Sequence, residues 1–172
     1  MNFHIQPATV QDLPVINDIY NYYVTRSTCT YQTDPETPES RREWFARHDA
    51  AHPVIVVEQD GQVVAWGSLT QLHSRQGYRV TVEDSIYVRH DMHRRGIGQA
   101  ILLELIQAAK TLGYHSIIAS ISADQDASVE LHRKNGFVQV GRLREVGWKF
   151  DRLLDVMYMQ LMLDAIPNIR PV

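Results

Sequence analysis

The sequence predicts a single α/β domain of the α+β kind, residues 1–172, in which helices flank a mixed, mostly antiparallel central sheet. At 172 residues the chain is long enough to bury a full core. Apolar residues alternate along several short segments and recur at helical spacing along others. These segments follow in the order strand, two helices, three strands, helix, strand, helix, two strands. That alternation predicts one layered domain.

The N-terminal third is expected to hold one strand and two helices. Residues 3–8 can form the strand, and Thr9–Asp12 is similar to a capping box at the start of a helix. One face of that helix collects Leu13, Ile16, Ile19, Tyr20 and Tyr23. Residues 25–34 show no clear period. Thr37-Pro38 is typical of an N-cap and first turn, and predicts a second helix that ends near residue 48.

The remaining segments are assigned by periodicity and by turn residues. Strands are predicted at Val54–Glu58, Val63–Leu72, Val82–Val88, Ser116–Ser122 and Phe137–Val140, with a last strand region made of Arg142–Trp148 and Leu154–Leu163. Helices are predicted from about Gln99 to Leu112 and over Ser128–Asn135. Asp60-Gly61 is a hairpin turn, and Gly113 and Gly136 end the two helices. Residues 164–172 are expected to form a loose tail.

Composition excludes several function classes. The chain is 44% hydrophobic and 22% charged, as in ordinary soluble proteins, and its net charge of −3 argues against general nucleic-acid or anionic-membrane binding. Residues 1–7 lack the features of a signal peptide, and the single cysteine, Cys29, suits a reducing compartment. We therefore expect a cytoplasmic protein. His90 and His93 have no further ligands at metal-site spacing, so no metal is expected.

The loop after strand 82–88 has the properties of an anion site. It holds Arg94, Arg95, Gly96 and Gly98 just before a helix, whose first N–H groups have no intrahelical partner. Glycines allow close backbone approach and positive φ, and arginines add charge, so a phosphate or pyrophosphate is the expected guest. The P-loop and dinucleotide patterns do not fit this run. The alternative is a plain glycine turn with two solvated arginines.

Three runs resemble known motifs. His93-Arg94-Arg95-Gly96-Ile97-Gly98 resembles the acyl-CoA loop of the GNAT acetyltransferases, with His93 in place of the usual Gln or Arg. Thr81–Val88 is similar to the Thr-Val-Glu-x-Ser/Thr-Val-Tyr-Val run of the phosphinothricin and methionine sulfoximine (methionine sulfone) acetyltransferases. Asp126–Phe137 resembles a third run of that subfamily, with Gln125 and Ala127 in place of its Asn and Pro. The resemblance covers nearly the whole chain.

The resemblance implies a GNAT fold in which the fourth and fifth strands splay apart around the pantetheine arm of acetyl-CoA. Backbone groups left unpaired by the splay would bond that arm as an added strand does. The residues implied in acetyl-CoA binding are Ile86, Tyr87, Val88, His93, Arg94, Arg95, Gly96, Ile97, Gly98, Gln99, Gln125 and Ser128.

Two residues are implied in catalysis. Glu83 would be the general base that takes the proton of the acceptor amine before direct attack on the thioester. Its alternative is an exposed strand glutamate. His132 stands where most of the family has a tyrosine that protonates the leaving sulfur. It could serve as donor, bind CoA, or be a helix histidine tied to a backbone group.

The acceptor side follows from the same resemblance and from charge. Arg75 and Arg79 could bind the carboxylate of a small amino-acid analogue, with His73 and Tyr31 adding polar contacts. Phosphinothricin, methionine sulfoximine and methionine sulfone are the leading acceptors, and a homodimer is implied. Two other functions stay open. One is acetylation of protein N-termini or polyamines, and the other is a non-catalytic acyl-CoA-binding module.

Overall fold

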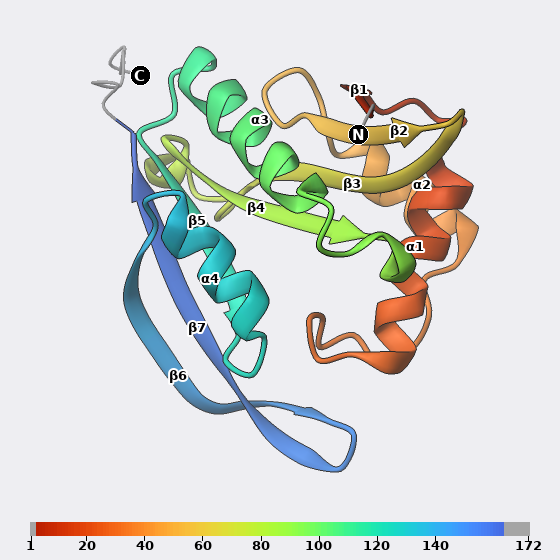
Figure 1. Cartoon of the computed structure of the whole chain (residues 1–172). Helices are drawn as coiled ribbons and strands as arrows, with labels where there is room; N and C mark the ends of the chain where they lie inside the picture. The colour runs from red at the N-terminus through yellow and green to blue at the C-terminus, as the bar shows by residue number, and fades with distance from the viewer. Residues whose placement is uncertain (1–2, 164–172) are drawn as a thin grey trace.

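The computed structural model describes residues 3–163, and all of its strands join one sheet (Figure 1). The strands are β1 (His4–Pro7), β2 (Val54–Gln59), β3 (Gln62–Gln71), β4 (Thr81–Val88), β5 (Ser116–Ser122), β6 (Val138–Lys149) and β7 (Arg152–Met162). The helices are α1 (Leu13–Arg26), α2 (Pro38–Ala46), α3 (Ile97–Thr111) and α4 (Asp126–Lys134). Short 3₁₀ turns at Gln76–Tyr78 and His90–Met92 were not expected from the sequence.

The predicted order of elements is confirmed. The strands lie in the order β1-β2-β3-β4-β5-β7-β6, and only the contact between β4 and β5 is parallel. The sheet is therefore mixed and mostly antiparallel, as the sequence predicts. The expected loose tail at 164–172 lies outside the described residues.

Turn and cap chemistry explains most of the boundaries. Thr37 caps α2, since its hydroxyl accepts a hydrogen bond of 3.1 Å from the Ser40 N–H. Asp60 and Gly61 have φ of 52° and 74°, the left-handed geometry of a two-residue hairpin turn. Thr9 and Asp12 bond each other before α1, although Asp12 makes no side-chain cap to the helix.

The division of β6 predicted from the sequence is wrong. Residues 137–140 and 142–148 were expected as separate segments, but β6 runs without a break from Val138 to Lys149 along β7. Two register shifts, at Gln139/Gly141 and Leu143/Gly147, absorb the irregular pattern. The hairpin closes at Phe150 and Asp151, both with positive φ. Likewise α3 begins at Ile97, two residues before the predicted start.

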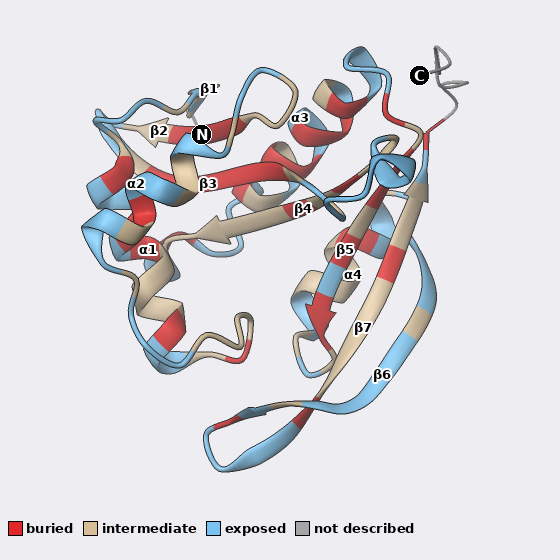
Figure 2. Cartoon of the chain, turned by 180° about the vertical axis from the view of Figure 1, so that it is seen from behind, coloured by how far each residue is buried: buried red, intermediate tan, exposed pale blue. Residues whose placement is uncertain are grey.

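Two apolar clusters cover the two faces of the sheet. The larger cluster lies under α3 and α4, on the face turned to the viewer in Figure 1, and includes Ile101, Leu105 and Ile117. The smaller one lies under α1 and α2 and includes Ile16 and Trp66. Figure 2 shows that burial concentrates in β2, β3, β5 and α3, whereas β4 is mostly intermediate and β6 is largely exposed.

Candidate active site

β4 places its two neighbouring carboxylates on opposite faces of the sheet. A Cβ atom on Gly67 of β3 would lie 2.4 Å from Ile101 of α3, so this side of β3 faces α3. Gly67 pairs with Ile86 of β4, and paired side chains share a face. Asp84 therefore faces α3 and α4, whereas Glu83 faces α1 and α2.

β4 and β5 separate directly after Glu83. Their pairing joins 81–83 of β4 to 116–118 of β5, although β4 continues to Val88 and β5 to Ser122. Figure 1 shows the two strands diverging beyond this contact. The splay expected between the fourth and fifth strands is thus present, and Glu83 lies at its apex.

Alternate residues of β4 direct their backbone groups into the gap left by the splay. The Arg89 N–H donates to the Val64 carbonyl of β3 at 2.8 Å, so odd-numbered residues here pair with β3. Ile86 and Val88 therefore direct their N–H and C=O groups toward the gap. An added strand would form hydrogen bonds with these backbone groups, and an extended ligand that contains amide bonds could do the same.

Two residues implied in acetyl-CoA binding are engaged within the protein. His93 Nε2 lies 2.6 Å from the Tyr23 hydroxyl and 3.2 Å from the Val88 carbonyl. The Tyr23 hydroxyl also donates to that carbonyl. Tyr87 pairs its backbone with Trp66 and stacks its ring on the indole, with centroids 4.8 Å apart. The structure therefore does not direct Tyr87 into the gap.

The carboxyl group of Glu83 is partly buried. Burial raises the pKa of its carboxyl group, a hydrogen bond with the Ser120 hydroxyl opposes that rise, and the nearby charge of Asp84 adds to it. The net shift is upward. A carboxylate with a raised pKa at a strand divergence is suited to accept a proton near neutral pH.

The loop from His93 to Gly98 opens α3 in the way that an anion site requires. Gly96 is the N-cap of α3 and has φ of 77°, and Arg94 also adopts positive φ, 61°. The first intrahelical bond of α3 joins the Ala100 N–H to the Gly96 carbonyl at 3.0 Å. The N–H groups of residues 97–99 therefore lie free of helix bonds beside the exposed Arg94 and Arg95. This arrangement fits a pyrophosphate.

His132 and Asp84 form a buried ion pair on the α3 and α4 face. Their side chains are 5% and 2% exposed, and Nε2 lies 3.0 Å from Asp84 Oδ2. His132 Nδ1 donates to the Ser128 carbonyl at 2.7 Å. Burial alone lowers the pKa of the imidazole, but the bond and charge of Asp84 and the Ser128 carbonyl raise it above its ordinary value. Both ring nitrogens are thus engaged, as in the alternative of a histidine tied to a backbone group.

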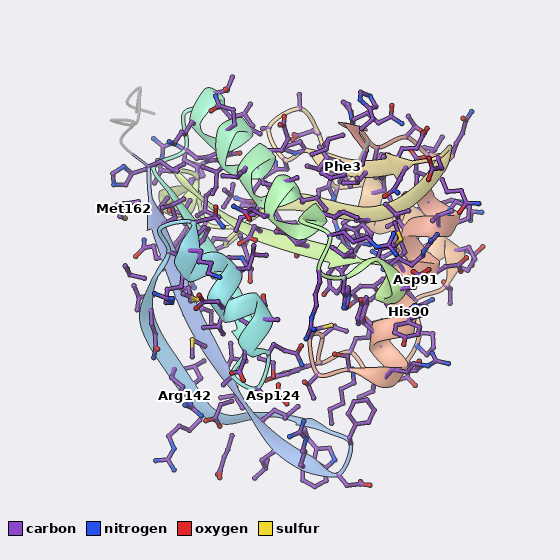
Figure 3. The ribbon with its side chains drawn as sticks, viewed as in Figure 1. Phe3, His90, Asp91, Asp124, Arg142 and Met162 are labelled. Carbon is purple, nitrogen blue, oxygen red and sulfur yellow. The ribbon has the colours of Figure 1, made fainter. Side chains whose placement is uncertain are left out.

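The start of α4 is bonded to the segment between α1 and α2. The Gln125 amide donates to the Thr28 hydroxyl at 2.7 Å, and Thr28 donates to Asp124 Oδ1 at 2.8 Å. Asp124, labelled in Figure 3 at the turn before α4, also forms an ion pair with Arg152 of β7. The Ser128 N–H closes the first turn on the Gln125 carbonyl. Gln125 therefore fastens the 27–37 segment rather than standing free.

Tyr31 reaches across the cleft on the face of Glu83. Its hydroxyl lies 2.9 Å from Ser122 Oγ of β5 and donates to the Asp155 carbonyl of β7 at 2.8 Å. Its ring lies against Gly147, where a Cβ atom would come within 2.4 Å of two ring carbons. Tyr31 thus forms a wall between β5 and the β6–β7 hairpin.

The other predicted acceptor residues lie on an exposed turn before β4. The His73 imidazole accepts a bond from the Arg75 N–H at 3.1 Å and packs against Tyr78. Arg79 Nη1 donates to the Gln76 carbonyl at 3.2 Å. Among residues 3–163, no hydrogen bond or ion pair joins the side chains of His73, Arg75 or Arg79 to that of Glu83.

Comparison with known proteins identifies the family. The model of the Acetyltransferase (GNAT) family matches residues 16–137. The chain belongs to this family. A methionine sulfoximine/methionine sulfone acetyltransferase of Pseudomonas paraeruginosa is 39% identical over 166 residues, 95% of this chain and 96% of that protein.

Solved structures agree with this GNAT assignment. A phosphinothricin acetyltransferase from Sinorhizobium meliloti in complex with AcCoA superposes with a TM-score of 0.94 at 30% identity, covering 100% of this chain and 94% of that one. A ribosomal-protein-alanine N-acetyltransferase from Brucella melitensis gives 0.90 at 38% identity, covering 93% and 99%. The predictions of a GNAT fold and of an acetyltransferase are therefore confirmed.

Sequence reasoning missed a second set of polar residues in this GNAT domain. Arg41 of α2 is only 3% exposed and packs over Tyr20, Trp44 and Trp66, on the same face as Glu83. These residues line a cavity. The available signal was an arginine on the face of α2 that also carries Trp44.

The described part of the chain offers neither a cluster of metal ligands nor a membrane-spanning helix. No group of three or more His, Cys, Asp or Glu side chains there is placed to hold a metal ion. Among the described helices, none has the length and apolar character needed to cross a membrane.

Proposed function

We propose that this chain is an acetyl-CoA-dependent N-acetyltransferase that acylates the α-amine of a small amino-acid-like compound. The observation that supports it most directly is Glu83, a desolvated carboxylate with a raised pKa at the apex where β4 and β5 part. Methionine sulfone, methionine sulfoximine and phosphinothricin are the leading acceptors, because relatives of similar length bear those names.

Acetyl-CoA fits the residues on the opposite side of the apex. The free N–H groups at the start of α3, with Arg94 and Arg95, would hold its pyrophosphate. The backbone groups of Ile86 and the N–H of Val88 would bond the amides of the pantetheine arm, since the Val88 carbonyl already accepts from Tyr23. Bound in this way, acetyl-CoA supplies an activated acetyl group as a thioester.

Glu83 would act on the acceptor from the α1 and α2 face. Its carboxylate takes a proton from the acceptor ammonium, directly or through a water. The amine nitrogen then forms a C–N bond to the acetyl carbon as the C–S bond breaks, and the leaving thiolate takes the second proton that this nitrogen gives up on becoming an amide. For His132 we propose the role that its contacts support, which is to hold α4 against β4.

Thiol release tests the function. Purified protein is assayed with methionine sulfone, methionine sulfoximine, phosphinothricin, spermidine and a short peptide. We expect turnover with the three amino-acid analogues. Turnover with the peptide or spermidine alone would redirect the substrate assignment, toward a protein acceptor if the peptide is used. Acetyl-CoA binding without thiol release on any acceptor would favour a non-catalytic module.

The role of Glu83 is tested by its titration. Because burial raises its pKa, kcat/KM should fall as pH drops through a value above that of an ordinary glutamate. Glu83→Gln should lose about 10²-fold or more in kcat at neutral pH. Glu104→Gln, an exposed change on α3, serves as the matched control. Undiminished turnover of Glu83→Gln would remove the base assignment.

A homodimer and a cytoplasmic location complete the proposal. β6 is an edge strand, and its apolar side chains Val138, Val140, Leu143, Val146 and Trp148 are 46–61% exposed. Such an unpaired apolar edge supports association with a second copy. Cys29 is a free thiol, which suits a reducing compartment. The single continuous sheet supports treating residues 1–172 as one domain.

A further inference from the structure

A cavity of about 240 Å³ lies between α2 and the sheet, on the face of β4 that carries Glu83. Arg41 and Trp44 of α2, Tyr20 of α1, Trp66 of β3 and the β4 residues Ser85 and Tyr87 contribute to its walls. This volume is smaller than a site for a drug-sized ligand, and it suits a small polar group on a short stem.

Arg41 brings a buried charge to this cavity without a direct ion pair, although Glu36 lies near enough to act on it electrostatically. Its Nε donates to Asn17 Oδ1 at 3.1 Å, and the guanidinium packs over the rings of Tyr20 and Trp44 at 4.6 and 4.7 Å. Its Nη2 is buried and has no hydrogen-bond partner in the described part of the chain. None of the ion pairs among residues 3–163 includes Arg41. A buried guanidinium in this state favours a guest with negative or strongly dipolar oxygen atoms.

A second unpaired donor lines the same cavity. Trp66 Nε1 is buried and also lacks a partner among the described residues. An indole N–H can only donate, so Arg41 and Trp66 together call for an acceptor of hydrogen bonds. Glu36 and Arg47 line the cavity as well. The Ser40 hydroxyl donates to Glu36 and lowers the pKa of that carboxyl, which therefore stays charged. Arg41 and Arg47 are positive and Glu36 is negative, so the cavity carries a net charge of about +1. This charge favours a singly charged or neutral oxo group over a polyanion.

One wall of the cavity lies on the same strand as Glu83. Ser85, one of its walls, is two residues farther along β4, which places the two Cα atoms about 7 Å apart on the same face. In methionine sulfone or phosphinothricin the oxygen-bearing sulfur or phosphorus lies four bonds from the amine nitrogen, an extended reach of about 5 Å. An acceptor of this length can therefore span from Glu83 into the cavity.

We propose that this cavity is the subsite for the oxygen-bearing side-chain terminus of the acceptor, a sulfonyl, sulfoximine or phosphinyl group, which accepts hydrogen bonds from Arg41 and Trp66 while the α-amine lies at Glu83. This inference rests on the function proposed above and adds a determinant of its substrate class. It makes Arg41 the residue that distinguishes oxidised from unoxidised side chains.

The experiment compares methionine sulfone with methionine, which differ only by the two sulfone oxygens. In Arg41→Gln, kcat/KM for the sulfone should fall at least tenfold, mainly through KM, while that for methionine changes less than twofold. Trp66→Phe keeps the ring but removes the N–H, and it should shift the ratio in the same direction by about threefold or more. Arg42→Gln, an exposed neighbour on α2, is the matched control.

The outcomes separate the subsite from the function. Equal losses on both substrates in Arg41→Gln and Trp66→Phe would show a structural role and overturn the subsite, while the acetyltransferase assignment stands. If the wild-type protein turns over neither compound, calorimetric binding of methionine sulfone decides. Weaker binding to Trp66→Phe than to wild type supports the subsite although the function fails. Equal binding, or none to wild type, overturns it.

Discussion

The buried pair of Asp84 and His132 leads to a prediction about stability and pH. Asp84→Asn removes the negative charge but keeps a side-chain oxygen that can accept the His132 Nε2 hydrogen. With side chains only 5% and 2% exposed, solvent screens the pair little. Removing one partner of a buried ion pair costs about 3–5 kcal/mol, and the retained bond should reduce this to about 2–3 kcal/mol at pH 6. For a chain of this length that is a fall in Tm of about 4–12 °C.

The pH dependence follows from the raised pKa of His132. A raised pKa in the folded state gives stability that is fully present below the unfolded value, and that is lost as pH rises through the folded value. Above that folded value the imidazole is neutral, and its Nε2 lone pair would face a carboxylate in the wild type but an amide N–H in Asp84→Asn. The difference between the two proteins should then shrink to about 1 kcal/mol or less.

Urea unfolding of both proteins across a pH series that rises from pH 6 measures these differences. Asp91→Asn is the control, since Asp91 is paired with Arg89 but 53% exposed, and its loss should cost less than about 1 kcal/mol. Figure 3 labels Asp91 at the end of β4. A destabilisation of Asp84→Asn that stays equal across the pH series, or that is absent at pH 6, would refute the argument that the charged pair stabilises the fold.

Three further predictions concern glycines and the exposed sheet edge. Gly96→Ala should cost about 1–2 kcal/mol and raise KM for acetyl-CoA, because φ of 77° strains any residue with a Cβ atom; thermal unfolding and saturation curves test this against Gly141→Ala, whose Cβ would have nothing within 4 Å. Gly147→Ala should displace Tyr31, cost about 1–3 kcal/mol and raise KM for the acceptor, while Gly141→Ala, with nothing within 4 Å, should leave both unchanged. Val140→Lys on β6 should shift sedimentation toward a monomer, whereas Val10→Lys, which is also exposed but lies outside the sheet, should not; a monomeric wild type would contradict the proposed edge contact.

The sequence by itself determined the order of the elements and the anion loop, because both depend on local rules. Alternation and helical spacing are properties of a few neighbouring residues, and so are the cap at Thr37, the turn at Asp60-Gly61 and the glycine at position 96. The opposite facing of Glu83 and Asp84 follows from the two-residue period of a strand. The irregular stretch at 137–149 was divided wrongly because its register shifts depend on pairing with β7.

Only the tertiary structure decided which partners the functional side chains meet. The bond between His132 and Asp84 joins residues 48 positions apart, and that between Tyr31 and Asp155 joins residues 124 apart. No local sequence pattern predicts contacts between residues so far apart in the chain. The cavity at Arg41 depends in the same way on α1, α2, β3 and β4 meeting at one place. From the sequence alone, a charged helix residue such as Arg41 is expected to be solvated. Only the packing of its neighbours shows that it is buried.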